Sequence, residues 1–268
     1  MANMLQLKNV TVSYKNVPTV QNFNLDMKQG QIVSLVGESG SGKTTLARVI
    51  LSLSKMTGGS VYIDGIDLAK ASRAEMKKLR SEIAVVFQDP ASNLNPRQTV
   101  ESSIMRPMII HGVPKAEAKK KAKEVLAMVK MDERYLESFP HQLSGGMRQR
   151  VMIALALAGD PELLIADEPT TALDVTIQAQ ILDLLIELKK KLQMSIIIIT
   201  HDLGVIAEMA DEVAVMYAGE IVEKAKTREL FDDPKHPYTV GLMNSIPDIN
   251  ETVKRLKTLD GLVPSLYD

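Results

Sequence analysis

Two glycine-rich stretches of the sequence contain residues that can hold phosphate groups. The first, GESGSGKT at residues 37–44, matches the pattern G-x4-G-K-[ST] of a phosphate-binding loop. It follows the apolar run Ile32–Val36 and precedes the helical run TLARVILSL. Glycines let backbone N–H groups approach phosphate oxygens, and the start of a helix favours negative charge. This stretch therefore predicts a loop that binds a nucleoside triphosphate.

Two residues of this loop have specific predicted roles. Lys43 is expected to reach the β- and γ-phosphates, and the Thr44 hydroxyl is expected to bind Mg²⁺. A glycine-rich turn could match the pattern by coincidence, but the strand before it and the helix after it are the context that the motif needs. The residues expected to contact nucleotide here are Gly37, Ser39, Gly40, Ser41, Gly42, Lys43, Thr44 and Thr45.

The stretch LLIADEP at residues 163–169 supplies two neighbouring carboxylates at the end of an apolar run. Asp167 is expected to hold Mg²⁺ through water at the carboxyl edge of a sheet. Glu168 is expected to polarise the attacking water as general base. An apolar run ending in Asp-Glu is common, but together with a phosphate-binding loop it predicts hydrolysis of ATP with Mg²⁺ as cofactor.

The second glycine-rich stretch is LSGGMRQR at residues 143–150. A single nucleotide needs one phosphate-binding loop, so a second one is redundant within one site. It is not redundant if two chains pack head to tail and each offers Ser144, Gly145 and Gly146 to the γ-phosphate held by the other. The alternative is a glycine turn that only caps a helix.

Short apolar runs predict the strands that position these residues. Nearly continuous apolar strands alternate with helical patterns such as residues 177–193, which predicts an α/β fold with a mostly parallel core sheet. In residues up to about 31, and in YIDGIDL at 62–68, apolar residues alternate with polar ones, which is typical of an antiparallel β flank. The predicted strands are IVSLVG (32–37), IAVVF (83–87), LLIAD (163–167), SIIIIT (195–200) and VAVMY (213–217).

The helical patterns also predict how the chain is divided. Residues 90–160 show helical patterns without a strong strand, which predicts a helical subdomain inserted into an ATP-binding domain of residues 1–230. Residues 231–268 are expected to form a C-terminal tail. The basic run at residues 115–130 predicts a helix with a solvated face.

Composition excludes several classes of protein. A net charge of −1 gives no sign of nucleic-acid binding, and the absence of cysteine excludes disulfides and thiolate metal sites. The amino terminus lacks the apolar core of a signal peptide, and the longest apolar runs are too short to span a bilayer. We therefore expect a soluble cytoplasmic protein that acts at a membrane only through partners.

The combination of LSGGMRQR, GESGSGKT and LLIADEP resembles the nucleotide-binding domain of ATP-binding cassette (ABC) proteins. The resemblance covers nearly the whole chain, from about Leu5 to Pro247, and LSGG before QR is its specific part. Met147 stands where the family most often has glutamine. The resemblance implies a P-loop NTPase fold of the ABC type, with ATP and Mg²⁺ as ligands.

The resemblance also assigns roles to four residues outside the three motifs. Tyr14 is similar to the aromatic residue that stacks on adenine, and Gln88 to the glutamine that contacts Mg²⁺ and the water. Asp174 is similar to the residue that senses the opposite site. His201 is similar to the histidine that contacts the γ-phosphate and orients Glu168. Taken singly, each could be a packing, loop or capping residue.

Longer stretches resemble importer ATPases for oligopeptides, dipeptides or nickel. Many such ATPases carry a cysteine motif for an iron–sulfur cluster after this tail, and this sequence has no cysteine. We therefore expect either a short form or a shortened sequence. The stretches are residues 87–100, 166–182 and 200–223, HPYT at 236–239 and SIP at 245–247.

The resemblance implies the ATP-hydrolysing subunit of a membrane importer. Its expected partners are transmembrane permease subunits, an identical or paralogous ATPase subunit and, indirectly, a solute-binding protein, all acting at the cytoplasmic face of the cell membrane. Two alternatives are a soluble ABC ATPase that acts on DNA or ribosomes, and a phosphate-loop kinase. The sequence leaves open the cargo and the choice between homodimer and heterodimer.

Overall fold

The computed structural model describes residues 3–15, 17–171 and 173–244, which divide into two compact units. The first unit contains the described residues up to Ala71 together with those from Ile198 onward. The second contains residues 72–197. The predicted SIP stretch at residues 245–247 and the last part of the predicted tail lie outside the described residues. The predicted domain boundaries stay a prediction.

An antiparallel sheet with the strand order β2-β1-β4-β5 lies in the first unit. Alternate residues of β2 between Phe23 and Met27 are buried, because one face of this sheet covers an apolar core. The predicted antiparallel flank is confirmed, although residues 62–68 contain a turn at Asp64–Gly65 that separates two strands. The strands are β1 (Asn3–Tyr14), β2 (Val17–Lys28), β4 (Gly58–Ile63) and β5 (Ile66–Asp67).

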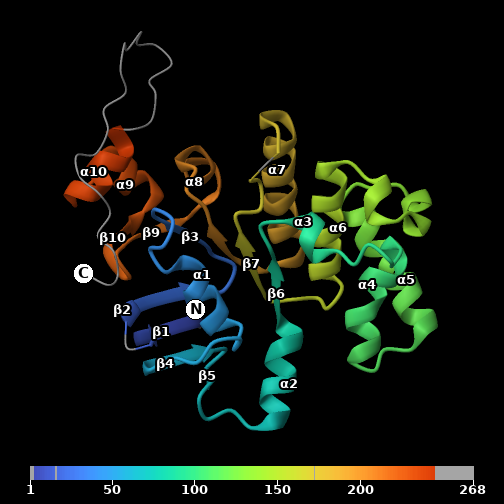
Figure 1. Cartoon of the computed structure of the whole chain (residues 1–268), viewed down its shortest axis with the longest axis horizontal. Coiled ribbons are helices and arrows are strands. Elements are labelled where there is room, and N and C mark those ends of the chain that lie inside the picture. The colour runs from blue at the N-terminus through green and yellow to red at the C-terminus, as the bar shows by residue number, and fades with distance from the viewer. Residues whose placement is uncertain (1–2, 16, 172, 245–268) are drawn as a thin grey trace. The chain divides into compact units, whose positions relative to one another are not determined.

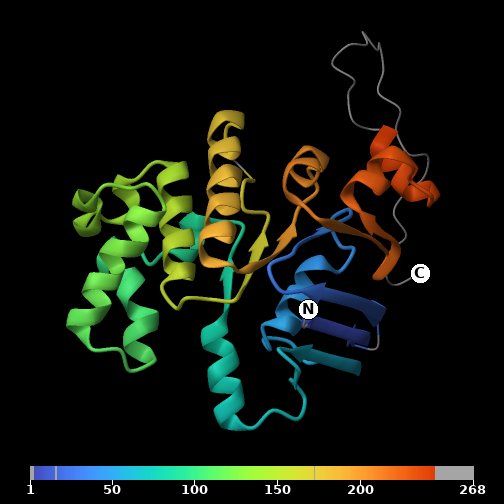
Figure 2. The ribbon, with the colours of Figure 1, turned by 180° about the vertical axis from the view of Figure 1, so that it is seen from behind.

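The first unit also contains three strands that carry the phosphate-binding loop and its surroundings. Strand β3 pairs in parallel with β9, and β9 pairs in antiparallel with β10. Helix α1 lies against β2, which both ribbon views show (Figures 1 and 2). These elements are β3 (Ile32–Val36), β9 (Glu212–Tyr217), β10 (Glu220–Lys226), α1 (Lys43–Ile50), α8 (Leu203–Met209), α9 (Thr227–Asp232) and α10 (Pro237–Asn244).

The second unit joins a parallel strand pair to a group of helices. Strands β6 (Ile83–Val86) and β7 (Leu163–Asp167) pair in parallel. Helices α4, α5 and α6 lie side by side in both views (Figures 1 and 2). The helices are α2 (Arg73–Glu82), α3 (Pro90–Asn93), α4 (Val100–Ile110), α5 (Lys115–Met128), η1 (Glu133–Glu137), η2 (Pro140–Gln142), α6 (Gly145–Leu157) and α7 (Val175–Leu192).

All five predicted core strands are present. Four of them are described above, and the fifth is β8 (Ser195–Ile199). The boundary between the two units falls inside this strand, between Ile197 and Ile198. Strands β3, β7 and β8 are buried throughout, as expected for strands that are covered on both faces. Parallel strands alternating with helices confirm the predicted α/β fold.

Helix α5 shows how the basic run folds. Its apolar residues Ala118, Ala122, Val125 and Leu126 recur at helical spacing and are buried, while most of its lysines point to solvent. The predicted helix with a solvated face is therefore confirmed. Among the described residues, we find no helix with the length and apolar character needed to cross a bilayer.

Candidate nucleotide-binding and hydrolysis site

The phosphate-binding loop connects β3 to α1 in the first unit, as predicted. Two glycines allow it to pass close to neighbouring backbone. A Cβ atom on Gly37 would lie 2.2 Å from the Met216 carbonyl oxygen, and one on Gly42 would lie 2.7 Å from the Thr19 carbonyl oxygen. Gly42 caps α1 with a φ of 100°, a conformation that favours glycine. The loop is therefore fixed in place by contacts that only glycine permits.

Lys43 begins helix α1, and its ammonium group folds back over the loop. Its Nζ atom donates to the carbonyl oxygens of Gly37 and Glu38, both at 2.7 Å, and to the Ser41 hydroxyl at 3.1 Å. The first turn of α1 contains no acidic residue, which leaves the positive end of the helix dipole without a carboxylate of its own helix. A positive charge beside a helix start suits the phosphates of a nucleotide.

The two predicted site residues of the first unit that lie outside the loop, Tyr14 and His201, are exposed. Tyr14 ends β1, its side chain is 47% exposed, and its hydroxyl lies 3.3 Å from the Ser54 hydroxyl. His201 lies two residues after the end of β8, and the N–H of the intervening Thr200 donates to the carbonyl of Leu35 in β3. The capping of α8 is carried out by Asp202, which accepts from two backbone N–H groups. The roles of Tyr14 and His201 toward nucleotide stay predictions.

Glu168 and Gln88 lie in the second unit, and the structure brings them together. Gln88 follows β6, Glu168 follows β7, and the Gln88 side-chain Nε2 donates to Glu168 Oε2 at 2.7 Å. The Thr171 hydroxyl donates to the same oxygen at 2.9 Å. Two donors on one oxygen fix the orientation of the carboxylate, which is what a general base needs.

The backbone of Glu168 is strained. Its φ is 47°, in the left-handed region that non-glycine residues rarely occupy. Such a conformation costs about 1–3 kcal/mol and tends to occur at functional sites. The strain, the two donors and the preceding buried Asp167 all support a functional role for this strand end.

The metal-binding assignments stay predictions. In the part of the chain that the structure describes, no group of three or more His, Cys, Asp or Glu side chains could hold a metal ion. Mg²⁺ in nucleotide sites is bound by one or two protein oxygens together with phosphates and water, so a complete protein cage is not required. The hydroxyl of Thr44, the carboxylate of Asp167 and the amide oxygen of Gln88 are donors of the kind that such a site uses.

The serine–glycine stretch begins helix α6. Ser144 caps the helix, and its hydroxyl accepts from the Met147 N–H at 3.3 Å. Ser144 is nevertheless exposed within the described chain, and Gly145 and Gly146 are half-buried. A Cβ atom on Gly146 would lie 2.6 Å from Ile177 Cγ2, so this glycine is also needed for packing α6 against α7. Ser144 therefore caps the helix, and binding to a neighbour's nucleotide stays a prediction.

Asp174 is the cap of the neighbouring helix α7. Its carboxylate accepts from the Ile177 N–H at 3.0 Å, and its side chain is exposed. The next residue, Val175, is 83% exposed. Asp174 and Val175 are thus both accessible at the start of α7.

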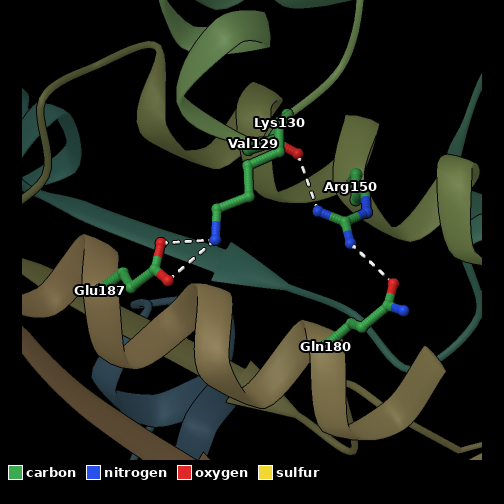
Figure 3. Close-up of polar contacts among 5 residues, drawn as sticks. All are labelled: Val129, Lys130, Arg150, Gln180 and Glu187. Atoms are coloured by element: carbon green, nitrogen blue, oxygen red, sulfur yellow. Dashed lines mark hydrogen bonds and ion pairs between the residues drawn. The ribbon is translucent and has the colours of Figure 1, made fainter. Parts of the chain in front are cut away.

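Arg150, at the end of the stretch LSGGMRQR, joins three helical segments of the second unit (Figure 3). Its guanidinium donates to the Val129 carbonyl just after α5 at 3.0 Å and to the Gln180 side chain of α7 at 3.2 Å. Burial lowers the pKa of Arg150. Nearby, Lys130 forms an ion pair with Glu187, and more than half of each of these two side chains is exposed.

We predict that Arg150→Ala lowers the free energy of unfolding by about 1.5–3 kcal/mol, since hydrogen bonds from a charged donor are lost in a partly buried place. Lys130→Ala is a matched control and is expected to cost less than about 1 kcal/mol, because its ion pair is exposed. Urea unfolding of the two variants checks the difference. Equal losses would contradict the structural role of Arg150.

Thr171 and Tyr238 were missed by sequence reasoning. Thr171 lies three residues after Glu168, in the stretch TTALD, and this spacing at the end of a strand was the available signal. Tyr238 lies in the stretch HPYT, which in the sequence indicates only the resemblance to importer ATPases. The Glu38 N–H donates to the Tyr238 hydroxyl at 3.1 Å.

Comparison with known protein families matches residues 20–171 to the ABC transporter family. The chain belongs to this family and is an ATP-binding cassette ATPase. A second match, to the oligopeptide/dipeptide transporter C-terminal region, covers residues 222–268. The predicted family resemblance is thus confirmed over most of the chain.

Two curated relatives are similar along nearly the whole chain. The dipeptide transport ATP-binding protein DppD of Lactococcus lactis subsp. cremoris (strain MG1363) is 44% identical over 278 residues, covering 99% of this chain and 80% of the relative. The oligopeptide transport ATP-binding protein OppD of Bacillus subtilis (strain 168) is 46% identical over 277 residues, covering 98% and 77%.

Solved structures of ATP-binding cassettes are also similar. A dimeric cassette in a post-hydrolysis state, bound to ADP and Pi, is 37% identical with a TM-score of 0.75, and the match covers 84% of this chain and 99% of that one. The protein cbiO1 of Clostridium perfringens, part of the ABC transporter complex cbiONQ, is 29% identical with a TM-score of 0.80, covering 87% and 92%.

Proposed function

We propose that this chain is the ATP-hydrolysing subunit of a peptide importer. The observation that carries this proposal is the similarity of 44–46% identity, along nearly the whole chain, to proteins named as dipeptide and oligopeptide transport ATP-binding proteins. The match of residues 222–268 to the peptide-transporter C-terminal region supports the same cargo class.

In the proposed reaction, the loop at residues 37–44 and Lys43 bind the phosphates of ATP. Mg²⁺, when bound, neutralises charge that develops on the phosphates, and its proposed ligands are Thr44, Gln88 and Asp167, the last through water. Glu168, held by Gln88 and Thr171, takes a proton from the attacking water. We assign adenine stacking to Tyr14 and contact with the γ-phosphate to His201.

We propose that two such ATPase subunits close head to tail on ATP. Ser144, Gly145 and Gly146 of one subunit then complete the γ-phosphate site of the other, and Asp174 contacts that opposite site. The exposure of Ser144, Asp174 and the apolar Val175 supports this arrangement. The related cassette with ADP and Pi is a dimer, which supports pairing as well.

We further propose that the second unit contacts a transmembrane permease subunit at the cytoplasmic face of the membrane. A cavity of about 470 Å³ lies between the segment after α3 and helix α4. Ile110, which is 70% exposed, lines it together with the polar residues Arg106 and His111. Closure and reopening of the ATPase pair would move this surface against the permease, and a solute-binding protein would deliver the peptide.

The proposed cargo is tested with the chain purified together with permease subunits of a peptide importer and reconstituted with a solute-binding protein. We expect short peptides, presented by that protein, to stimulate ATP hydrolysis, while nickel chelates leave the rate at its basal value. Stimulation only by a nickel chelate would contradict the peptide assignment. ATP hydrolysis stimulated by DNA or ribosomes, without permeases, would contradict the importer itself.

A further inference from the structure

Helix α10 begins within the stretch HPYT, and its Tyr238 contacts the phosphate-binding loop inside the first unit. The Tyr238 hydroxyl accepts a hydrogen bond from the Glu38 N–H at 3.1 Å, and only 7% of the residue is exposed. Its ring lies 4.6 Å from the ring of Tyr217 on β9. Tyr238 therefore reaches from the last described helix to the second residue of the loop.

The turn before α10 is held in a defined position. The Glu223 carboxylate on β10 accepts from the backbone N–H groups of Lys235 at 2.8 Å and His236 at 2.9 Å. The Tyr238 N–H then donates to the His236 Nδ1 atom at 3.1 Å. The apolar cluster around Tyr238 includes Val36, the last residue of β3 before the loop. These contacts place the Tyr238 hydroxyl with little freedom to move.

The contact matters because both backbone polar groups of Glu38, its N–H and its carbonyl, form hydrogen bonds to side chains. Its N–H donates to Tyr238, and its carbonyl accepts from Lys43 Nζ at 2.7 Å. A change in the position of Glu38 would therefore also change the position of the Lys43 ammonium. Burial raises the pKa of Tyr238 above its ordinary value near 10, so its hydroxyl is neutral at physiological pH.

We propose that Tyr238 is a positioning residue for ATP binding: it holds Glu38, and through Glu38 it fixes the loop and Lys43 in the form that receives the phosphates. The C-terminal segment that begins at HPYT thereby tunes the affinity of the chain for nucleotide. This inference rests on the proposed function in one respect, namely that ATP is the ligand of the loop.

The test compares Tyr238→Phe, which removes only the hydroxyl, with Tyr217→Phe, which removes a hydroxyl from the adjacent ring and leaves the Glu38 contact intact. Amide hydrogen exchange of residues 37–42 is measured without nucleotide, and the KM for ATP and kcat are measured with Mg²⁺. For Tyr238→Phe we expect faster amide exchange in residues 37–42. We also expect the KM for ATP to rise by about 2- to 12-fold, which corresponds to the loss of one neutral hydrogen bond, while kcat stays nearly unchanged.

A second variant, Glu223→Gln, loosens the turn that places Tyr238 and is expected to shift the KM in the same direction. Unchanged exchange and unchanged KM in Tyr238→Phe would overturn the proposal, and so would equal effects of Tyr217→Phe. Failure of the unsubstituted chain to bind ATP would overturn the proposed function instead, while the exchange rates would still decide whether Tyr238 positions the loop.

Discussion

Glu168→Gln is expected to slow ATP hydrolysis by about 10²–10⁴-fold, because the variant loses the group that takes a proton from the attacking water. The fold around it should persist. The glutamine side-chain oxygen can still accept hydrogen bonds from Gln88 and Thr171, which both donate to Oε2 of the native carboxylate. ATP binding should be retained, and ATP-driven pairing of subunits should become long-lived.

The matched control is Glu162→Gln, which makes the same chemical change at an exposed residue just before the opposite end of β7. Its rate of hydrolysis should equal that of the unsubstituted chain. Steady-state phosphate release and size-exclusion chromatography with ATP measure the two effects. An unchanged rate in Glu168→Gln would show that another group acts as the base.

Mixing two inactive variants is expected to restore ATP hydrolysis. Lys43→Ala lacks the ammonium that folds over the loop, and Ser144→Arg fills the exposed helix cap with a bulky side chain. In a head-to-tail pair, each mixed dimer contains one site with an intact loop from one chain and an intact cap from the other. Random pairing should therefore give about a quarter of the normal number of complete sites.

A double variant carrying both substitutions provides the control. When it is mixed with the unsubstituted chain, each mixed dimer should contain no complete site, so activity should fall below the value expected from dilution. Phosphate release from equimolar mixtures, assembled with the permeases, measures both cases. Activity that follows simple dilution in both mixtures would mean that each chain completes its own site.

The sequence was sufficient for the strands and for the residues at their ends. Continuous apolar runs identified β3, β7 and β8, and motif spacing placed Lys43 at the start of α1 and Glu168 after β7, as the structure shows. Patterns of this kind are local and are therefore readable along the chain. The family resemblance, and not a local pattern, marked Gln88 as a residue that contacts Mg²⁺ and the water; its hydrogen bond of 2.7 Å to Glu168 is a finding of the structure.

Other contacts could not be predicted from local patterns. Tyr238 and Glu38 are 200 residues apart, and their hydrogen bond depends on how β10, the following turn and α10 pack onto β3. The spacing of apolar residues indicates which face of a helix or strand is buried, but it does not indicate which side chain from a distant part of the sequence packs against that face. The left-handed backbone of Glu168 is likewise a result of tertiary packing, since nothing in the residue type favours it.

The close contact between Gly146 and Ile177 has a consequence for how subunits recognise each other. Because Gly146 lets α6 pack closely against the Ile177 side chain of α7, and Arg150 connects the two helices again further along, the Ser144 cap and the Asp174 cap belong to two directly packed helices. A second chain that engages one of them must fit both at once. In the proposed head-to-tail pair, incorrect partners would thereby be rejected by shape, before any chemistry on the nucleotide begins.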